Sequence, residues 1–121
     1  MILADTSVWI DHLRSGDPKL TALLETGAIL GHPFVTGEIA LGSLRHPARV
    51  IADLRRLPQA TTASPDEILD VIRRRSLQAR SIGYVDAHLI AAVLLTPHTL
   101  LWTKDRHLNQ AAADLSLLYL P

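Results

Sequence analysis

The sequence predicts an α/β fold with a mostly parallel central sheet and helices on both faces. Short apolar runs, typical of buried strands, alternate with longer segments of helical periodicity along the chain. The first run, 2–5, ends in an aspartate and leads directly into a helical segment. Parallel strands need crossover segments, and helical crossovers cover the faces of a sheet. The 121 residues are enough for a core, and we expect them to form one domain over 1–121.

Proline and glycine mark most element boundaries in the first half of the chain. Prolines at 18, 33 and 47 suit the first turn of a helix, whereas Gly16 and Gly27 follow helical segments as stops. The elements expected here are strands at 2–5 and 28–31 and helices at 7–14, 18–25, 34–44 and 47–57.

The clearest helix signal in the second half is the segment 64–67, Ser-Pro-Asp-Glu. It combines an N-cap serine, a proline at the first helical position and a glutamate three residues after the cap. The helical pattern that follows breaks up around 76–83. The other elements expected here are strands at 59–63 and 99–103, helices at 84–95 and 105–115, and an edge strand at 117–120.

The composition limits which cellular compartments and which kinds of metal or disulfide site are possible. The chain has no cysteine, which excludes disulfides and thiolate metal sites and fits a reducing cytoplasm. Its longest uninterrupted apolar run, 89–95, is too short to span a bilayer, and no signal peptide is visible at the N-terminus. We therefore expect a cytoplasmic protein without a membrane segment.

The net charge is zero, but the basic residues are unevenly distributed. Eight of the twelve lie in two segments, 45–56 and 73–80. These arginines are either solvated helix faces or a surface for a polyanion, and the sequence leaves both interpretations open.

Four carboxylates stand out because of where they fall in this pattern. Asp5 ends the first strand and Asp105 follows the strand at 99–103, whereas Glu38 and Asp86 lie within apolar helical segments. Parallel strands share one carboxyl edge, so the two strand-end acids are expected at the same edge, where the other two could lean over them. Taken singly, each has a simpler interpretation: a helix N-cap for Asp105, a partly exposed rim for Glu38, and an ordinary buried ion pair for the rest.

Carboxylates that lie close together repel one another. Two unit charges 4 Å apart cost roughly 4 kcal/mol at an effective dielectric constant near 20, so such a cluster needs protons or cations. An all-oxygen ligand set favours Mg²⁺ or Mn²⁺ over zinc, and these ions commonly act on phosphates by polarising the ester and activating water. Thr6, Ser7 and Thr103 flank the acids and could orient ligands or metal-bound water, although an ordinary turn role is simpler for Thr6.

Four segments, Asp5–Ile10, Glu38–Gly42, Gly83–Leu89 and Trp102–Leu108, occur in this order. Together they resemble the PIN-domain family, and specifically the VapC-type toxins of bacterial toxin–antitoxin pairs. The resemblance covers essentially the whole chain. It implies a PIN-like fold and an Mg²⁺- or Mn²⁺-dependent endoribonuclease that hydrolyses RNA through metal-activated water.

The resemblance also implies site residues and partners. The metal ligands and catalytic acids would be Asp5, Glu38, Asp86 and Asp105, with Asp5 and Asp86 the firmest, and hydroxyls at Ser7 and Thr103 would lie near the metal. Members usually form homodimers, and a cognate antitoxin blocks the site. Under this interpretation the arginines could hold RNA phosphates or antitoxin acids: Arg49 and Arg56 would share a helix face, as would Arg73 and Arg80 if their helix continued.

The remaining aromatic residues give little sign of a base-stacking surface. Trp9 and Trp102 are expected in the core, and His88 and His107 are expected to be structural or surface residues although they lie near proposed ligands. Recognition of RNA backbone and shape is therefore favoured over stacking.

Two other functions fit parts of the pattern. A PIN-fold binding module with vestigial acids would keep the fold without cleavage, although all four acids are present. A receiver-type phosphoacceptor domain has similar length and alternation. It would carry an acid at the end of its central strand, whereas the segment 59–63 has none and Asp86 falls within a helical pattern.

Overall fold

A three-stranded parallel sheet lies at the centre of the computed structural model, which describes residues 1–121. The strands are β1 (Ile2–Ala4), β2 (Ile29–Leu30) and β3 (Leu100–Trp102), in the order β2-β1-β3. The central strand β1 pairs in parallel with both neighbours. The predicted α/β architecture with a mostly parallel sheet is confirmed.

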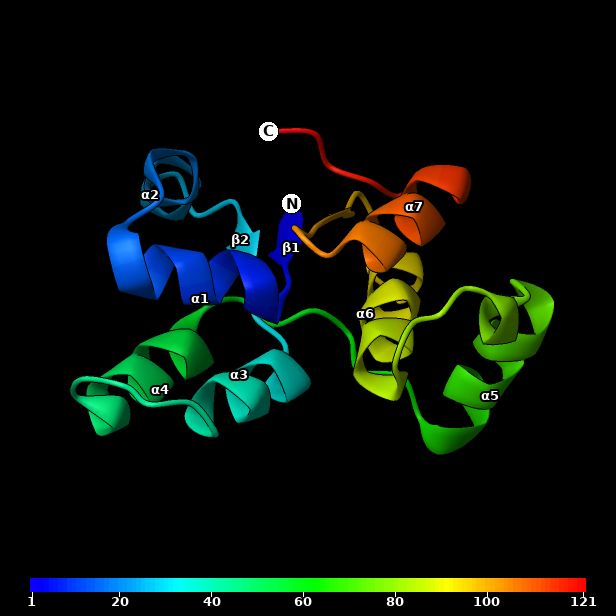
Figure 1. Ribbon diagram of the computed structural model, residues 1–121, viewed down its shortest axis with the longest axis horizontal. Coiled ribbons are helices and arrows are strands. Elements are labelled where there is room, and N and C mark those ends of the chain that lie inside the picture. The colour runs from blue at the N-terminus through cyan, green and yellow to red at the C-terminus, as the bar shows by residue number, and fades with distance from the viewer.

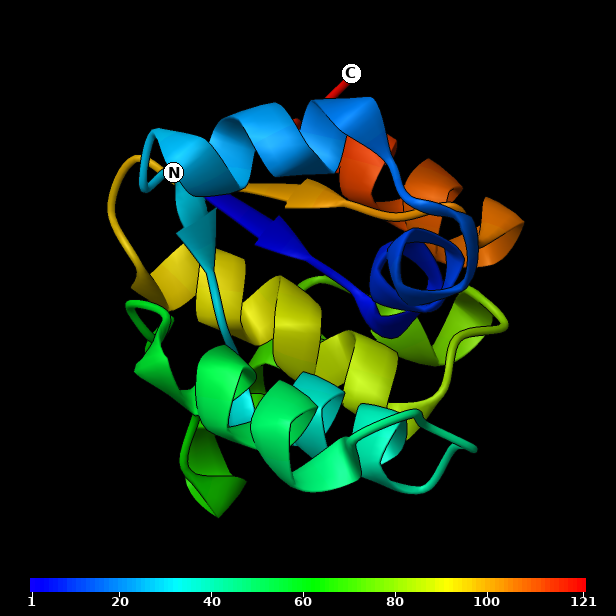
Figure 2. The ribbon, with the colours of Figure 1, turned by 90° about the vertical axis from the view of Figure 1, so that its left-hand side faces the viewer.

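Seven α-helices and one short 3₁₀ helix surround this sheet. They are α1 (Thr6–Ser15), α2 (Pro18–Glu25), α3 (Pro33–Ala40), α4 (Pro47–Arg56), α5 (Pro65–Arg74), η1 (Leu77–Ala79), α6 (Tyr84–Leu95) and α7 (Arg106–Asp114). Helices α1 and α2 cover one face of the sheet, and α6 and α7 cover the other (Figure 1). Helix α5 packs on α6, and α3 packs on both α1 and α4. Figure 2 shows α2 and α6 on opposite sides of the sheet. None of these helices is long and apolar enough to cross a membrane.

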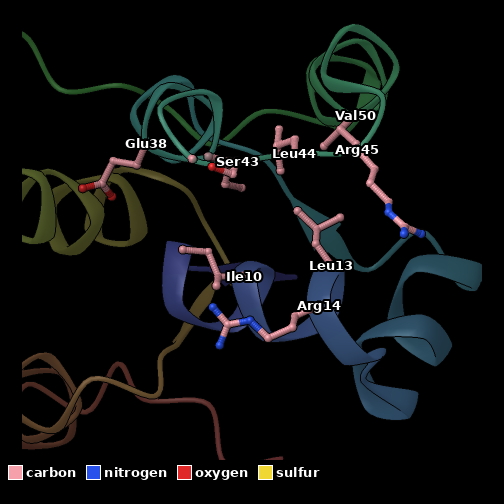
Figure 3. Close-up of a pocket in the computed structure, with 10 residues that line it drawn as sticks. Ile10, Leu13, Arg14, Glu38, Ser43, Leu44, Arg45 and Val50 are labelled. Carbon is pink, nitrogen blue, oxygen red and sulfur yellow. The ribbon is translucent and has the colours of Figure 1, made fainter.

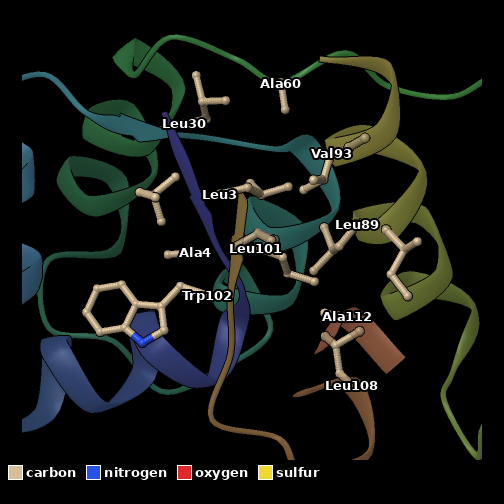
Figure 4. Close-up of a cluster of buried hydrophobic side chains, with 14 of the residues drawn as sticks. Leu3, Ala4, Leu30, Ala60, Leu89, Val93, Leu101, Trp102, Leu108 and Ala112 are labelled. Atoms are coloured by element: carbon tan, nitrogen blue, oxygen red, sulfur yellow. The ribbon is translucent and has the colours of Figure 1, made fainter. Parts of the chain in front are cut away.

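Most of the helix caps, helix stops and core residues predicted from the sequence are present in the structure. Ser64 caps α5 in a complete capping box with Glu67, and Gly16 ends α1 in the left-handed region at φ 75°. The most apolar helix, α6, has seven buried residues because it lies between the sheet and α5. Figure 4 shows Leu89 and Val93 of this helix pointing toward the buried strands. Trp9 and Trp102 are both in the core, as expected.

Two predicted strands are wrong in extent. The segment 59–63 forms a single bridge, between Gln59 and Gly31, after which Thr61 N–H donates to the Thr96 hydroxyl instead of a neighbouring strand. The segment 117–120 likewise forms one bridge to β3, at Leu118. Both segments extend the sheet edges by a single residue pair, so no further strand forms.

The third helix is shorter than predicted. The pattern predicted a helix over 34–44, but α3 ends at Ala40. Its last turn tightens, because Leu41 N–H bonds to both Gly37 and Glu38 carbonyls, and Gly42 N–H donates to the Ile39 carbonyl. Glu38 therefore lies in the final turn of the helix rather than in its middle.

A close backbone approach at Gly31 gives a test of this packing. A Cβ at Gly31 would meet the Gln59 side-chain nitrogen at 2.5 Å, and that nitrogen is fixed by hydrogen bonds to the Leu54 and Leu57 carbonyls. We expect Gly31→Ala to lower the free energy of unfolding in urea by about 1–3 kcal/mol through overpacking.

The matched control is Gly37→Ala, in the middle of α3, where a new Cβ meets nothing within 4 Å. It should raise stability by about 0.5–1 kcal/mol, because alanine is the better helix former. Equal effects of the two substitutions would contradict the predicted clash at Gly31.

Candidate active site

The site is built where β1 and β3 end side by side. Asp5 follows β1, and its backbone N–H donates to the Trp102 carbonyl at 3.0 Å, which places Thr103 directly beside it. From β1 the chain crosses to β2 on one side, whereas β3 lies on the other. The carboxyl ends of strands at such a switch point are where open α/β sheets form their ligand sites.

Asp5 is buried, and donors hold both of its carboxylate oxygens. Its Oδ1 accepts from the Ser7 hydroxyl at 2.5 Å and from Val8 N–H at 3.2 Å, and its Oδ2 accepts from the Thr103 hydroxyl. Burial raises the pKa of Asp5, and the bonds from the Ser7 and Thr103 hydroxyls oppose that rise.

The two hydroxyls are themselves oriented by backbone groups. Ser7 Oγ accepts from Lys104 N–H at 2.9 Å, and Thr103 Oγ1 accepts from Asp105 N–H at 3.0 Å. Each hydroxyl oxygen therefore accepts through one of its two lone pairs and directs its proton at Asp5. The hydroxyls predicted to flank this acid do so, and they fix the plane of its carboxylate.

Glu38 reaches this edge from α3. It is exposed, and its Oε1 accepts from the Thr6 hydroxyl at 2.6 Å, which links the last turn of α3 to the first turn of α1. Glu38 occupies the solvent side of the short terminal turn, so the simpler interpretation of an exposed rim position holds and the apolar segment around Glu38 does not bury it. Thr6, for which a turn role was the simpler interpretation, instead holds this acid.

Asp86 reaches the same edge from the first turn of α6. It is half-buried, and its Oδ2 accepts from Gly83 N–H at 3.3 Å. Burial raises the pKa of Asp86, and the charges of Asp105, Asp5 and Glu38 raise it further. The four carboxylates are thus close enough for three of them to act on the fourth.

Asp105 is both an acid of this group and an N-cap. Its Oδ1 accepts from Leu108 N–H at 2.9 Å at the start of α7, and its side chain is exposed. The interpretation of Asp105 as a helix N-cap is therefore confirmed. Asp105 also lies close enough to Asp86 for its charge to raise the pKa of Asp86.

Three helices direct their N-termini at this edge. Asp5 caps α1, Gly83 caps α6 and Asp105 caps α7. A helix N-terminus carries roughly half a positive charge, so the three together offset part of the acidic charge. The charges of the other three acids still raise the pKa of Asp86, so the offset is incomplete there.

The donor set suits a hard divalent cation, although the side chains do not converge on one point. No three His, Asp or Glu side chains lie close enough together to hold a metal ion between them. Each acid is instead engaged by a protein donor, such as Thr6 for Glu38 and Gly83 N–H for Asp86. All four candidate metal ligands are carboxylates, and a bound cation would lower the raised pKa values of Asp5 and Asp86. The chemistry of these residues therefore fits Mg²⁺ or Mn²⁺.

A groove that the sequence pattern does not directly predict opens beside Glu38. It encloses about 670 Å³ between α1, α3 and α4. In Figure 3, Ile10 and Leu13 face Leu44 and Val50 across this groove, with Glu38 at one end. Its ten lining residues also include two arginines, Arg14 and Arg45. Ile10 and Leu13 are about 40% exposed. In the sequence, the only sign of this groove is that two large apolar residues stand three apart in the first helix.

The predicted pairing of arginines is only partly right. Arg49 and Arg56 lie on α4, where Arg56 contacts Asp53 at 3.4 Å. Arg73 and Arg80 do not share a helix face, because α5 ends before residue 80.

Arg73 and Arg80 each form an ion pair with an acid outside the site. Arg80 lies at the end of η1 and bonds Asp114 at 2.5 Å, and Arg73 is paired with Asp70. Of the four predicted contacts for RNA or antitoxin, Arg49 alone has no ion pair.

Comparison with known proteins gives a consistent result. The sequence model of the PIN domain family matches residues 2–114. Ribonuclease VapC32 of Mycobacterium tuberculosis, from strain CDC 1551 / Oshkosh and from strain ATCC 25618 / H37Rv, is 43% identical to this chain over 114 residues. The similarity covers 94% of this chain and 92% of each relative.

The like charges around Asp86 have a measurable cost. Asp86→Asn keeps an oxygen for Gly83 N–H and removes the charge that the other acids oppose. We expect it to raise the free energy of unfolding of the metal-free protein at pH 7 by about 1 kcal/mol in urea titrations.

The effect should depend on pH and on metal. The ionised carboxylate costs stability above the raised pKa of Asp86, so the gain from Asp86→Asn should shrink as the pH falls through that pKa. Added Mn²⁺ should stabilise the wild type more than the variant. The control, Asp66→Asn in the first turn of α5, should change stability by less than about 0.5 kcal/mol; a gain as large as that of Asp86→Asn would refute the electrostatic explanation.

Proposed function

The chain belongs to the PIN-domain family, and we propose that it is a divalent-metal-dependent endoribonuclease acting as the toxin of a type II toxin–antitoxin pair. The observation that carries the proposal is the group of four carboxylates at the carboxyl edge of the sheet, whose charges act on Asp86. Support also comes from its 43% identity to a protein named as a ribonuclease. Membership of this family leaves the receiver-type alternative without support.

In this proposal Asp5 and Asp86 would hold Mg²⁺ or Mn²⁺, and Glu38 and Asp105 would complete the acidic set. The ion would polarise the scissile phosphodiester and lower the pKa of an attacking water. The chain's own part is to fix its ligands: Ser7 and Thr103 lock the Asp5 carboxylate, and the strand beneath gives it a rigid base.

Glu38 is the acid best placed to handle a proton. It is exposed, and only its Oε1 is engaged, by the Thr6 hydroxyl. Its Oε2 is therefore free to accept a proton from the attacking water, while Thr6 holds the orientation of the carboxylate.

One observation favours an alternative, a PIN-fold binding module without nuclease activity. No three of the acidic side chains converge to metal-ligand distances. Under the nuclease proposal, Asp5 would stay where its three donors hold it. Glu38, Asp86 and Asp105 each accept from a single protein donor and would turn toward the ion. Direct titration of the protein with metal and RNA separates the two possibilities.

The metal-ligand role of Asp5 predicts a large loss of activity. Asp5→Asn and Asp86→Asn should each lower Mg²⁺- or Mn²⁺-dependent RNA cleavage by at least about 100-fold, because even outer partners of metal ligands are worth 10–100-fold. New 5′ ends in total RNA after induced expression provide the measurement in cells. Asp66→Asn, which changes an exposed acid on α5, is the control and should cleave like the wild type. Full activity in folded Asp5→Asn would rule the proposed role out.

The groove beside Glu38 is the proposed contact for a cognate antitoxin. Its walls combine exposed apolar side chains such as Leu13 with the cations Arg14 and Arg45, which form no ion pair. This surface fits a protein segment that carries apolar and acidic side chains. A segment seated there would cover Glu38 and so obstruct the acid site.

The antitoxin proposal predicts that binding and catalysis can be separated. Leu13→Glu should weaken binding of the small protein encoded by the adjacent reading frame by at least about tenfold in calorimetry, because it places a charge in the apolar wall. RNA cleavage without that partner should stay near the wild-type rate. Leu69→Glu, at an exposed leucine on α5, is the matched control, and equal effects of the two variants would argue against the groove.

A homodimer is also part of the proposal. Two large apolar side chains, Leu41 and Tyr84, are 90% and 57% exposed. A dimer interface that covers them would remove this apolar area from water.

A further inference from the structure

Two helices of this chain open with the same dipeptide, His-Pro, in different ways. His32 precedes α3, has no exposed surface, and accepts the Phe34 N–H on its Nδ1 at 3.0 Å. His46 precedes α4, is exposed, and makes no side-chain cap; its backbone is left-handed at φ 53°. Only His32 therefore combines a cap with complete burial.

His32 begins a chain of rings that runs from α3 to α6. Its ring lies 5.4 Å from that of Phe34, the Phe34 ring lies 4.5 Å from that of His88, and the His88 ring lies 4.7 Å from that of Tyr84. The three pairs meet edge to face, with interplanar angles of 78°, 65° and 85°, which is a favourable aromatic geometry. These rings bring the two helices together although they are far apart in sequence.

The ring chain joins the two helices that carry Glu38 and Asp86. Phe34 and Glu38 are four residues apart on α3, on the same side of the helix. Asp86 is two residues from both Tyr84 and His88, so it lies on the other side of α6, and the rings affect it through the placement of that helix. The ring contacts therefore set how α3, with Glu38, lies against α6, with Asp86.

Two buried nitrogens within this ring chain have no partner. They are Nε2 of His32 and Nδ1 of His88. Because His32 accepts through Nδ1, its neutral ring carries the proton on Nε2, so one of these atoms is a donor and the other can accept. Burial and the neighbouring His88 lower the pKa of His32 to about 4, which keeps the ring neutral at pH 7.

We propose that His32 is a positioning residue of the acid site: its cap on α3 and the ring chain through Phe34 and His88 fix Glu38 relative to Asp86. The proposal rests on the proposed nuclease function and adds a residue to it. Glu38 needs such support, because it is exposed and its own hydrogen bond, from Thr6, anchors it to α1 and not to α6.

Three variants separate the parts of this role. His32→Ala removes the cap and the ring, whereas His32→Asn keeps a good capping oxygen and removes only the ring. His46→Ala changes the same dipeptide at α4, where the side chain makes no cap, and serves as the control. Circular dichroism and thermal unfolding establish the temperature at which all three are folded.

Two readouts are then taken well below the unfolding transition. Calorimetry measures Mn²⁺ affinity, which involves no RNA, and steady-state kinetics measure kcat and KM for RNA cleavage with Mg²⁺. We expect His32→Ala to weaken Mn²⁺ binding and to lower kcat, each by about tenfold, with KM little changed. His32→Asn should recover part of both losses, and His46→Ala should match the wild type.

A double-mutant cycle tests whether His32 acts through Glu38. If it does, adding His32→Ala to Glu38→Gln should cost little further activity, whereas adding it to Asp105→Asn should cost the full amount. Simple additivity with Glu38→Gln would overturn the proposal, as would wild-type Mn²⁺ affinity and kcat in folded His32→Ala.

The outcomes also distinguish this proposal from the one on which it rests. A wild type that binds Mn²⁺ but does not cleave RNA would overturn the nuclease function alone, because calorimetry still reports on positioning. A wild type that does not bind Mn²⁺ would overturn both.

Discussion

The burial and crowding of carboxylates at one sheet edge is the constraint on which the rest of the structure depends. Burial raises the pKa values of Asp5 and half-buried Asp86, and the three neighbouring acids raise that of Asp86 further. The fold opposes this cost in two ways: three helix N-termini point at the edge, and oriented hydroxyls donate to Asp5. The remaining cost is what a divalent cation would relieve. A site that destabilises the empty protein in order to bind an ion is a common form of the trade-off between stability and activity.

The parts of this site that the sequence predicts are those fixed by strand pairing and helix caps. Asp5 and Thr103 are adjacent because parallel strands end at the same edge, and Asp105 caps a helix because it directly precedes one. The sequence leaves open whether Glu38 lies in an apolar helix or at an exposed rim, because its exposure depends on where α3 stops. That end is set by a tight turn at 41–42, whose hydrogen bonds an apolar pattern does not specify. The single bridge at Gln59 shows the same limit: an extended segment becomes a strand only when a neighbour continues beside it.

The two His-Pro steps show why identical local sequence can have different roles. Both prolines open helices, as their fixed φ favours. The histidine before Pro33 is extended and lies under α3, so its Nδ1 meets a backbone donor, whereas the one before Pro47 is left-handed and points to solvent. Tertiary packing decides between these outcomes, because only the first helix has α6 beside it to bury the ring. A capping preference therefore predicts where a helix starts but not whether its cap contributes to a site.

Glu38 belongs to two surfaces at once, and this links catalysis with recognition. It is one of the three acids that act electrostatically on Asp86, and it also lines the groove between α1, α3 and α4. Its Oε1 is held from α1 by Thr6, and α1 also supplies the groove residues Ile10 and Leu13. A partner that fills the groove must therefore contact the helix that orients this acid. Because α3 is held to α6 by rings and to α1 by Thr6, a small shift of α3 changes the acid cluster and the groove together. If a partner fills the groove as proposed, its control of the site would require no long-range pathway, since Glu38 belongs to both the groove and the acid cluster.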